Sequence, residues 1–132
     1  MSLIRSLLDI CDLPSQDIDD YLRHFLLAFD GDTLAGVVGL ENRGSGALLR
    51  SLAVDPAYRG MGIGKALTGK ILDHAVALGI REIGLLTTTA EHFFARAGFT
   101  QVDKDAVPDF VKASKEYRLY CPSTAVCMVK HL

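Results

Sequence analysis

A glycine-rich segment in the middle of the sequence has the residue types of a phosphate-binding loop. It reads Arg59-Gly60-Met61-Gly62-Ile63-Gly64-Lys65 and connects an apolar run that ends at Val54-Asp55-Pro56 to a helical pattern. Alternate glycines allow several backbone N–H groups to converge on one point, at the positive end of the helix dipole. Arg59 and Lys65 flank the segment with two cationic side chains. We therefore expect this segment to hold a phosphate group.

Three phosphate-binding patterns compete for the segment. The dinucleotide pattern G-x-G-x-x-G needs a third glycine at position 65 or 67, where the chain has Lys65 and Leu67. The Walker pattern is approached at residues 64–70, but Ile71 replaces the Ser or Thr that would hold magnesium. The third pattern, Arg-x-x-Gly-x-Gly/Ala, seats a pyrophosphate on successive backbone amides, and residues 59–64 fit it.

This third pattern resembles the GNAT family of N-acetyltransferases, which bind acetyl-CoA. The resemblance covers residues 33–99, including Leu-Ala-Val-Asp-Pro at 52–56 and Ala-Gly-Phe at 97–99. It implies one N-acetyltransferase domain over residues 1–132, acetyl-CoA as co-substrate and no metal. Shorter strings at 48–54, 85–90 and 121–128 resemble the small acetyltransferases associated with arsenic-resistance operons. They imply that the acceptor is an arsenic-related or other xenobiotic amino compound.

The resemblance also assigns roles in cofactor binding. The backbone of Leu52, Ala53 and Val54 would pair with the pantetheine arm, and the Val54 amide would point at the thioester oxygen. The pyrophosphate would lie on backbone amides of the loop. These residues are Gly60, Met61, Gly62, Ile63, Gly64 and Lys65, beside Arg59.

The acid that would protonate the leaving thiolate is not evident from the sequence. Family members often place a tyrosine where this chain has Phe94, and an asparagine where it has Thr87. Phenylalanine has no proton to donate, although a thiolate with a pKa near 8.5 is a fair leaving group. Tyr117 and Tyr120 are the candidate substitutes, and Thr87 is a candidate substrate contact. The missing acid also supports an alternative function, a non-catalytic acyl-CoA-binding or sensor protein.

Two charged residues are candidates for contacts with the acceptor amine and its substituents. Glu41, at the end of a predicted strand, is the candidate general base, with an exposed strand-end residue as the alternative. Arg50 is costly to bury without a partner. It is expected to reach solvent, to bind an anionic group of the substrate, or to pair with Glu41. The two-residue period of a strand places Arg50 on the same face as Leu52 and Val54.

Hydrophobic periodicity predicts an α+β chain in which an antiparallel meander precedes a strand-helix-strand unit. Helices are expected over residues 3–11, 15–25, 63–78 and 90–97, and strands over 25–29, 33–41, 47–54, 82–88, 99–102 and 123–129. A polar segment with a helical middle is expected over 104–118. Family members commonly open with a strand, whereas this chain starts almost directly in a helix. We therefore expect either a missing first strand or a sheet that begins one strand later.

Composition limits the classes of partner. The chain has 132 residues, of which 49% are hydrophobic, and its net charge of -2 and pI near 6.0 argue against nucleic-acid binding and attachment to a membrane surface. No apolar run approaches the length of a membrane span. Three widely spaced cysteines predict a reducing cytoplasm, with Cys121 and Cys127 as buried thiols rather than metal ligands. A homodimer is a family-level expectation.

Overall fold

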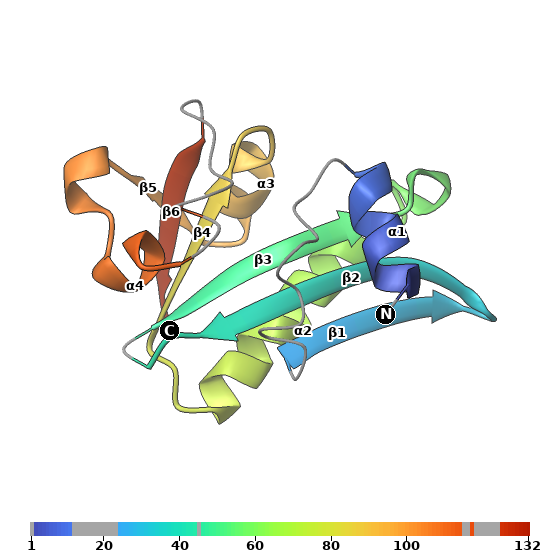
Figure 1. Ribbon diagram of the computed structural model, residues 1–132, viewed down its shortest axis with the longest axis horizontal. Helices are drawn as coiled ribbons and strands as arrows, with labels where there is room; N and C mark the ends of the chain where they lie inside the picture. The colour runs from blue at the N-terminus through green and yellow to red at the C-terminus, as the bar shows by residue number, and fades with distance from the viewer. Residues whose placement is uncertain (1, 12–23, 45, 115–116, 118–124) are drawn as a thin grey trace.

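The computed structural model describes residues 2–11, 24–44, 46–114, 117 and 125–132 (Figure 1). Within them, one mixed sheet has the strand order β1-β2-β3-β4-β6-β5. Its strands are β1 (Phe25–Asp30), β2 (Thr33–Asn42), β3 (Ala47–Val54), β4 (Glu82–Thr87), β5 (Thr100–Val102) and β6 (Val126–His131). The helices are α1 (Ser2–Ile10), α2 (Ile63–Ala77), α3 (Glu91–Arg96) and α4 (Asp109–Lys112), with short 3-10 turns η2 (Pro56–Tyr58) and η3 (Lys104–Ala106).

The predicted antiparallel meander is confirmed. The β1–β2 hairpin closes through Gly31, whose φ of 59° is readily adopted by glycine. The β2–β3 connection closes with a hydrogen bond from the Arg43 N–H to the Gly46 carbonyl, at 2.9 Å. Gly44 has a φ of 86° in this turn, as a tight hairpin requires.

The two halves of the sheet are joined by little backbone pairing. β3 and β4 run parallel and pair at two positions, Ala47 with Ile83 and Leu48 with Gly84. Beyond these pairs β3 continues to Val54 and β4 continues to Thr87, and Figure 1 shows the two strands diverging. The divergence opens the sheet at its centre.

Helices cover both faces of the sheet (Figure 1). The α2 and α3 side chains pack on one face with the largest hydrophobic cluster, while α1 and α4 pack on the other face with separate clusters. Gly36 lets α2 approach β2 closely, since a Cβ there would lie 2.9 Å from both Ile63 Cγ2 and Leu67 Cδ1. Each face therefore has its own core.

A β-bulge in β3 changes the face of the sheet on which the Arg50 side chain lies. Ser51 has a φ of 61°, and the β2–β3 register shifts between Val37 and Gly39. Leu49 and Leu52 consequently pack on the same α2 face, although they are three residues apart. Arg50 contacts Glu41 on the opposite face, so the prediction that it shares a face with Leu52 and Val54 was wrong.

Several predicted boundaries also shift. The last strand runs to His131 because Lys130 and His131 pair with β4, so its predicted end at Val129 was too early. Phe25 begins β1 and is not part of a helix. The rest of the predicted helix over 15–25 lies largely outside the described residues.

Candidate active site

The end of β3 presents its backbone to the opening between β3 and β4. The Asp55 N–H donates a hydrogen bond to the Ala35 carbonyl on the β2 side, at 2.8 Å. Backbone groups alternate in direction along an antiparallel strand, so those of Val54 point away from β2 and toward the opening. The Val54 amide is therefore directed as a donor to a group lying between the two strands would be.

The glycine loop leaves the N-terminus of α2 without a side-chain cap. Gly62 is the N-cap, with a φ of 80°, and Gly60 has a φ of 84°. A Cβ at either glycine would meet nothing within 4 Å, so backbone conformation rather than crowding favours glycine there. The N–H groups of the first turn, residues 63–65, have no intrahelical acceptor and are directed out of the helix end. This geometry suits an anionic group such as a pyrophosphate.

The start of α2 lies against both halves of the opening. A Cβ at Gly64 would lie 3.6 Å from Phe93 Cζ of α3 and 3.7 Å from Val54 Cγ2 of β3. The candidate anion site and the Val54 backbone are thus adjacent. A long ligand with a phosphate at one end could reach from the helix end into the opening.

The two flanking cations differ in their surroundings. The Arg59 Nε donates to the Val54 carbonyl at 3.2 Å, and its Nη2 lies 3.5 Å from Cys11 Sγ at the end of α1. Cys11 Sγ also lies 3.6 Å from the Val54 carbonyl. Arg59 therefore turns back toward β3 in this conformation, while Lys65 is exposed beside the loop.

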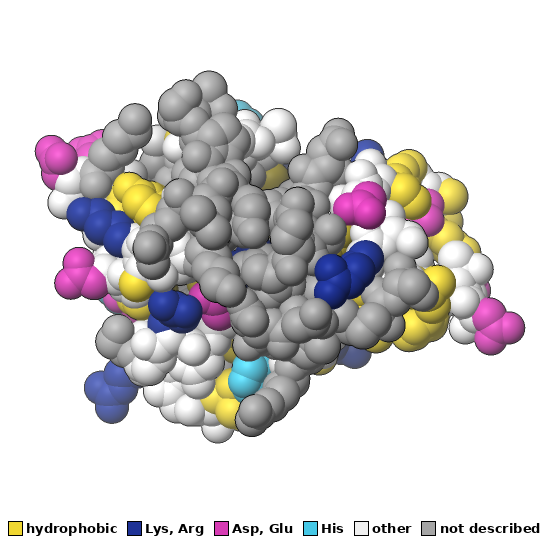
Figure 2. Space-filling view, viewed as in Figure 1, with side chains coloured by type: hydrophobic (Ala, Val, Ile, Leu, Met, Phe, Trp, Pro, Cys, Tyr) yellow, Lys and Arg dark blue, Asp and Glu magenta, His cyan; other side chains and the backbone are white. Residues whose placement is uncertain are grey.

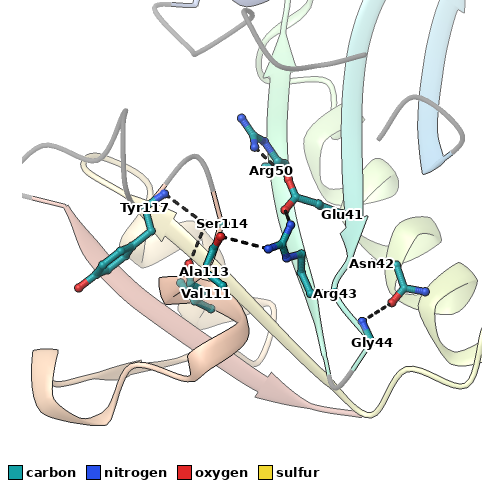
Figure 3. Close-up of polar contacts among 9 residues, drawn as sticks. All are labelled: Glu41, Asn42, Arg43, Gly44, Arg50, Val111, Ala113, Ser114 and Tyr117. Carbon is teal, nitrogen blue, oxygen red and sulfur yellow. Dashed lines mark hydrogen bonds and ion pairs between the residues drawn. The ribbon is translucent and has the colours of Figure 1, made fainter. Parts of the chain in front are cut away.

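Glu41 and Arg50 form a buried ion pair on the face between α1 and α4 (Figure 3). Arg50 Nη1 lies 3.1 Å from Glu41 Oε1, and the exposed fractions of the two side chains are 0% and 10%. Arg43 Nη1 lies 3.1 Å from the other oxygen, Oε2, and its Nη2 donates to the Ala113 carbonyl at 3.0 Å. Glu41 is therefore held between two guanidinium groups, and it is not the exposed strand-end residue considered as an alternative.

The short helix α4 reaches this cluster because two glycines let it lie close to the sheet. A Cβ at Gly46 would collide with the Phe110 ring, and one at Gly84 would collide with Val111 Cγ2. After the helix, Ser114 Oγ donates to the Val111 carbonyl and accepts from the Tyr117 N–H, at 2.7 and 3.2 Å. These contacts fix the end of α4 beside Arg43.

The aromatic residue at the position of the expected acid belongs to the core. Phe94 is 5% exposed and makes edge-to-face contacts with Phe93 and Phe99. The Thr87 hydroxyl accepts the Ala90 N–H at 3.0 Å, so it orders the start of α3. Tyr120, the other candidate acid, lies outside the described residues.

The described part of the surface carries charges of both signs. In Figure 2, acidic and basic side chains are interspersed over the described part of the face with α1 and α4. In the described ranges, no group of three His, Cys, Asp or Glu residues could hold a metal ion, and no helix is long and apolar enough to span a membrane. Cys127 is buried, and Cys121 lies outside the described residues.

Sequence reasoning missed three residues near the site. Arg43 stands two residues after Glu41, just past the end of β2, and this spacing could have indicated a shared face. Cys11 gave no local signal, because its contacts to the end of β3 are tertiary. Tyr58 was also missed: its hydroxyl donates to Asp30 at 2.9 Å, which raises the pKa of Tyr58 above its ordinary value.

The model of the acetyltransferase (GNAT) family matches residues 5–99. The chain belongs to the GNAT family. This GNAT chain is 44% identical over 55 residues to an amino-acid acetyltransferase of Mycobacterium tuberculosis, covering 42% of this chain and 31% of that protein. It is 36% identical over 67 residues to the amino-acid acetyltransferase of Escherichia coli K12, covering 51% of this chain and 15% of the relative.

Two solved structures that contain coenzyme A share the fold along nearly the whole chain. Rv2747 from Mycobacterium tuberculosis, in complex with CoA and NLQ, has a TM-score of 0.82 at 24% identity, covering 99% of this chain and 93% of that one. N-acetylglutamate synthase from Neisseria gonorrhoeae, complexed with coenzyme A and N-acetyl-glutamate, has a TM-score of 0.80 at 25% identity, covering 99% and 31%. The predicted family and fold are confirmed.

Proposed function

We propose that this GNAT protein transfers the acetyl group of acetyl-CoA to the amine of a small amino compound. The observation that carries the proposal is the placement of the uncapped α2 N-terminus next to the outward-pointing Val54 backbone. A helix end that suits a pyrophosphate and a strand edge that suits a pantetheine arm meet at one opening.

Different residues of the chain would bind different parts of acetyl-CoA. The amides of residues 60–65 would hold the pyrophosphate, with the Lys65 ammonium beside them. The backbone of Leu52, Ala53 and Val54 would align the pantetheine arm, and the Val54 N–H would stabilise negative charge on the thioester oxygen. Acetyl-CoA supplies an activated acyl group, so the protein needs to position the amine and remove its proton.

The acceptor would be an amino compound with an anionic group. Arg50 is the candidate residue for that group, because a guanidinium donates hydrogen bonds to a carboxylate or a phosphonate. Its side chain is 0% exposed and already bonded to Glu41, so this contact requires the acceptor to displace what covers Arg50. The relatives named amino-acid acetyltransferase support a carboxylate. Within this class we propose an arsenic-related or other xenobiotic amino acid, because the short strings of the sequence resemble the small acetyltransferases associated with arsenic-resistance operons.

The two proton transfers are assigned to a base and an acid of this chain. Each Glu41 oxygen already accepts a guanidinium N–H and keeps a second lone pair, so Glu41 is proposed to anchor Arg50 and to act as base. Tyr120 is the proposed acid, and Thr87 the proposed substrate contact at the start of α3. Glu41→Gln tests the base, since loss of a base lowers kcat and removes the acidic limb of its pH profile.

A thiol-release assay tests the activity. Purified protein is given acetyl-CoA and a panel of amines that pairs each amino acid with its decarboxylated analogue and includes phosphonate and arsenic-bearing amino acids. We expect saturable CoA release that depends on the amine and favours the anionic member of each pair. Absence of acetyl-CoA binding by calorimetry would refute the proposal, and equal rates within the pairs would refute the role of Arg50.

The second candidate is an acyl-CoA sensor without transferase activity. Phe94, buried in the core at the position of the usual acid, is the observation that favours it. Acetyl-CoA binding without CoA release for any amine would support the sensor, whereas amine-dependent release would exclude it. A cytoplasmic homodimer is proposed in either case, and light scattering on the purified protein tests the dimer.

A further inference from the structure

Glu41 is held from two directions, and the second holder is outside the residues assigned to the reaction above. Arg50 contacts Oε1 from β3, whereas Arg43 contacts Oε2 from the β2–β3 turn. We propose that Arg43 is a positioning residue that fixes the orientation of the Glu41 carboxylate, and through it that of the Arg50 guanidinium, on the acceptor side of the site. This inference rests on the proposed function, because it concerns the acceptor side of the same site.

The strands place Glu41 and Arg50 on one face, and the β2–β3 turn brings Arg43 to the same face. Glu41 pairs with Leu48 and Gly39 pairs with Arg50, so Glu41 and Arg50 are diagonal neighbours across β2 and β3. Arg43 follows Glu41 by two residues, and its backbone is fixed by the hydrogen bond to Gly46 that closes the turn. Arg43 can therefore restrain Glu41 without contacting the acceptor itself.

The other end of Arg43 is bound to the residue that follows α4. Its Nη2 donates to the Ala113 carbonyl after α4, seventy positions along the chain, and α4 packs over Gly46 and Gly84 on either side of the β3–β4 junction. β3 and β4 share two backbone pairs and then diverge. The contacts from Ala113 through Arg43 and Glu41 to Arg50 thus link the end of α4 to β2 and β3, beside the opening where the acceptor would bind (Figure 3).

The contact requires the shape of an arginine. One guanidinium donates to Glu41 Oε2 and the Ala113 carbonyl from two different nitrogens. A lysine has one ammonium on a flexible stem, so it keeps the charge but loses the fixed fork that joins the two acceptors. A lysine variant therefore separates the contribution of geometry from that of charge.

The test compares Arg43→Gln and Arg43→Lys with the wild type, using Arg96→Gln on the exposed surface of α3 as matched control. Initial rates of CoA release give KM for the best acceptor of the panel, KM for acetyl-CoA, and kcat. We expect both Arg43 variants to raise the acceptor KM about tenfold, because misplacing a binding group weakens the oriented complex. KM for acetyl-CoA and the midpoint of thermal unfolding should stay close to those of the control.

A second comparison tests whether Arg43 acts through Glu41. In a Glu41→Gln background, adding Arg43→Gln should raise the acceptor KM less than twofold further, because the link is already broken. Full additivity, or Arg43 variants that behave like Arg96→Gln in an active enzyme, would overturn the inference and leave the proposed function intact. A wild type without amine-dependent CoA release would overturn both.

Discussion

Replacing Glu41 with leucine would leave the Arg50 guanidinium buried without the carboxylate that it contacts. The Arg50 side chain is 0% exposed and its Nη1 lies 3.1 Å from Glu41, so water cannot readily replace the lost partner. Removing one member of a buried ion pair lowers the free energy of unfolding by about 3–5 kcal/mol. Because domains of this kind are stable by about 5–15 kcal/mol, the variant should remain folded but be strongly weakened.

The structure also predicts how strongly related variants lower the stability of the fold. Arg50→Met leaves Glu41 paired with Arg43, so it should lower stability by about 1–2 kcal/mol, less than Glu41→Leu does. Arg43→Gln removes an ion pair whose arginine is 34% exposed, and should cost about 1 kcal/mol or less. The double variant Glu41→Leu/Arg50→Met should recover most of the stability, because apolar side chains of similar volume can replace a buried pair.

Urea denaturation, monitored by circular dichroism, measures the free energy of unfolding of each variant. With an m-value of about 2 kcal/mol/M, a loss of 4 kcal/mol lowers the urea midpoint by about 2 M. If Glu41→Leu and Arg50→Met were equally destabilising and their effects simply added in the double variant, the pair would not be coupled and the reasoning would be refuted.

Three further predictions concern the loop, α4 and the hairpin. Gly62→Ala should lower stability by about 1 kcal/mol, because residue 62 has a left-handed backbone conformation. It should also weaken CoA binding measured by calorimetry, and an unchanged CoA affinity would argue against the loop as the anion site. Gly84→Ala should lower stability by about 1–3 kcal/mol in urea denaturation, because its Cβ would overpack Val111; a neutral effect would show that α4 does not lie so close. The Tyr58 phenol, which donates to Asp30, should ionise above its ordinary pKa, so its stabilising effect is present below about pH 10 and is lost as the pH rises through the raised value. Absorbance at 295 nm should show this late ionisation and its return toward the ordinary pKa in Asp30→Asn.

Much of the fold could be predicted from local pattern. The meander follows from alternating apolar residues and the Asp30-Gly31-Asp32 turn, and α2 and α3 end close to Gly79 and Gly98, which are local stop signals. The end of β6 could not be predicted in this way. Lys130 looks like a residue past the end of a strand, yet its backbone pairs with Ile83, and its ammonium donates to the Ala97 carbonyl.

The sequence by itself determined the glycine-rich loop and the family, because glycine spacing and the adjoining helical pattern are local properties of the chain. The charged cluster of Glu41, Arg43 and Arg50 depended on tertiary structure. The bulge at Ser51 reverses the alternation of side chains in β3 and turns Arg50 to the face opposite Leu52, which strict periodicity does not reveal. Pairing between strands brings Arg50 to Glu41, and the packing of α4 brings the Ala113 carbonyl to Arg43. These residues are far apart in sequence, so only the folded chain determines which charges meet.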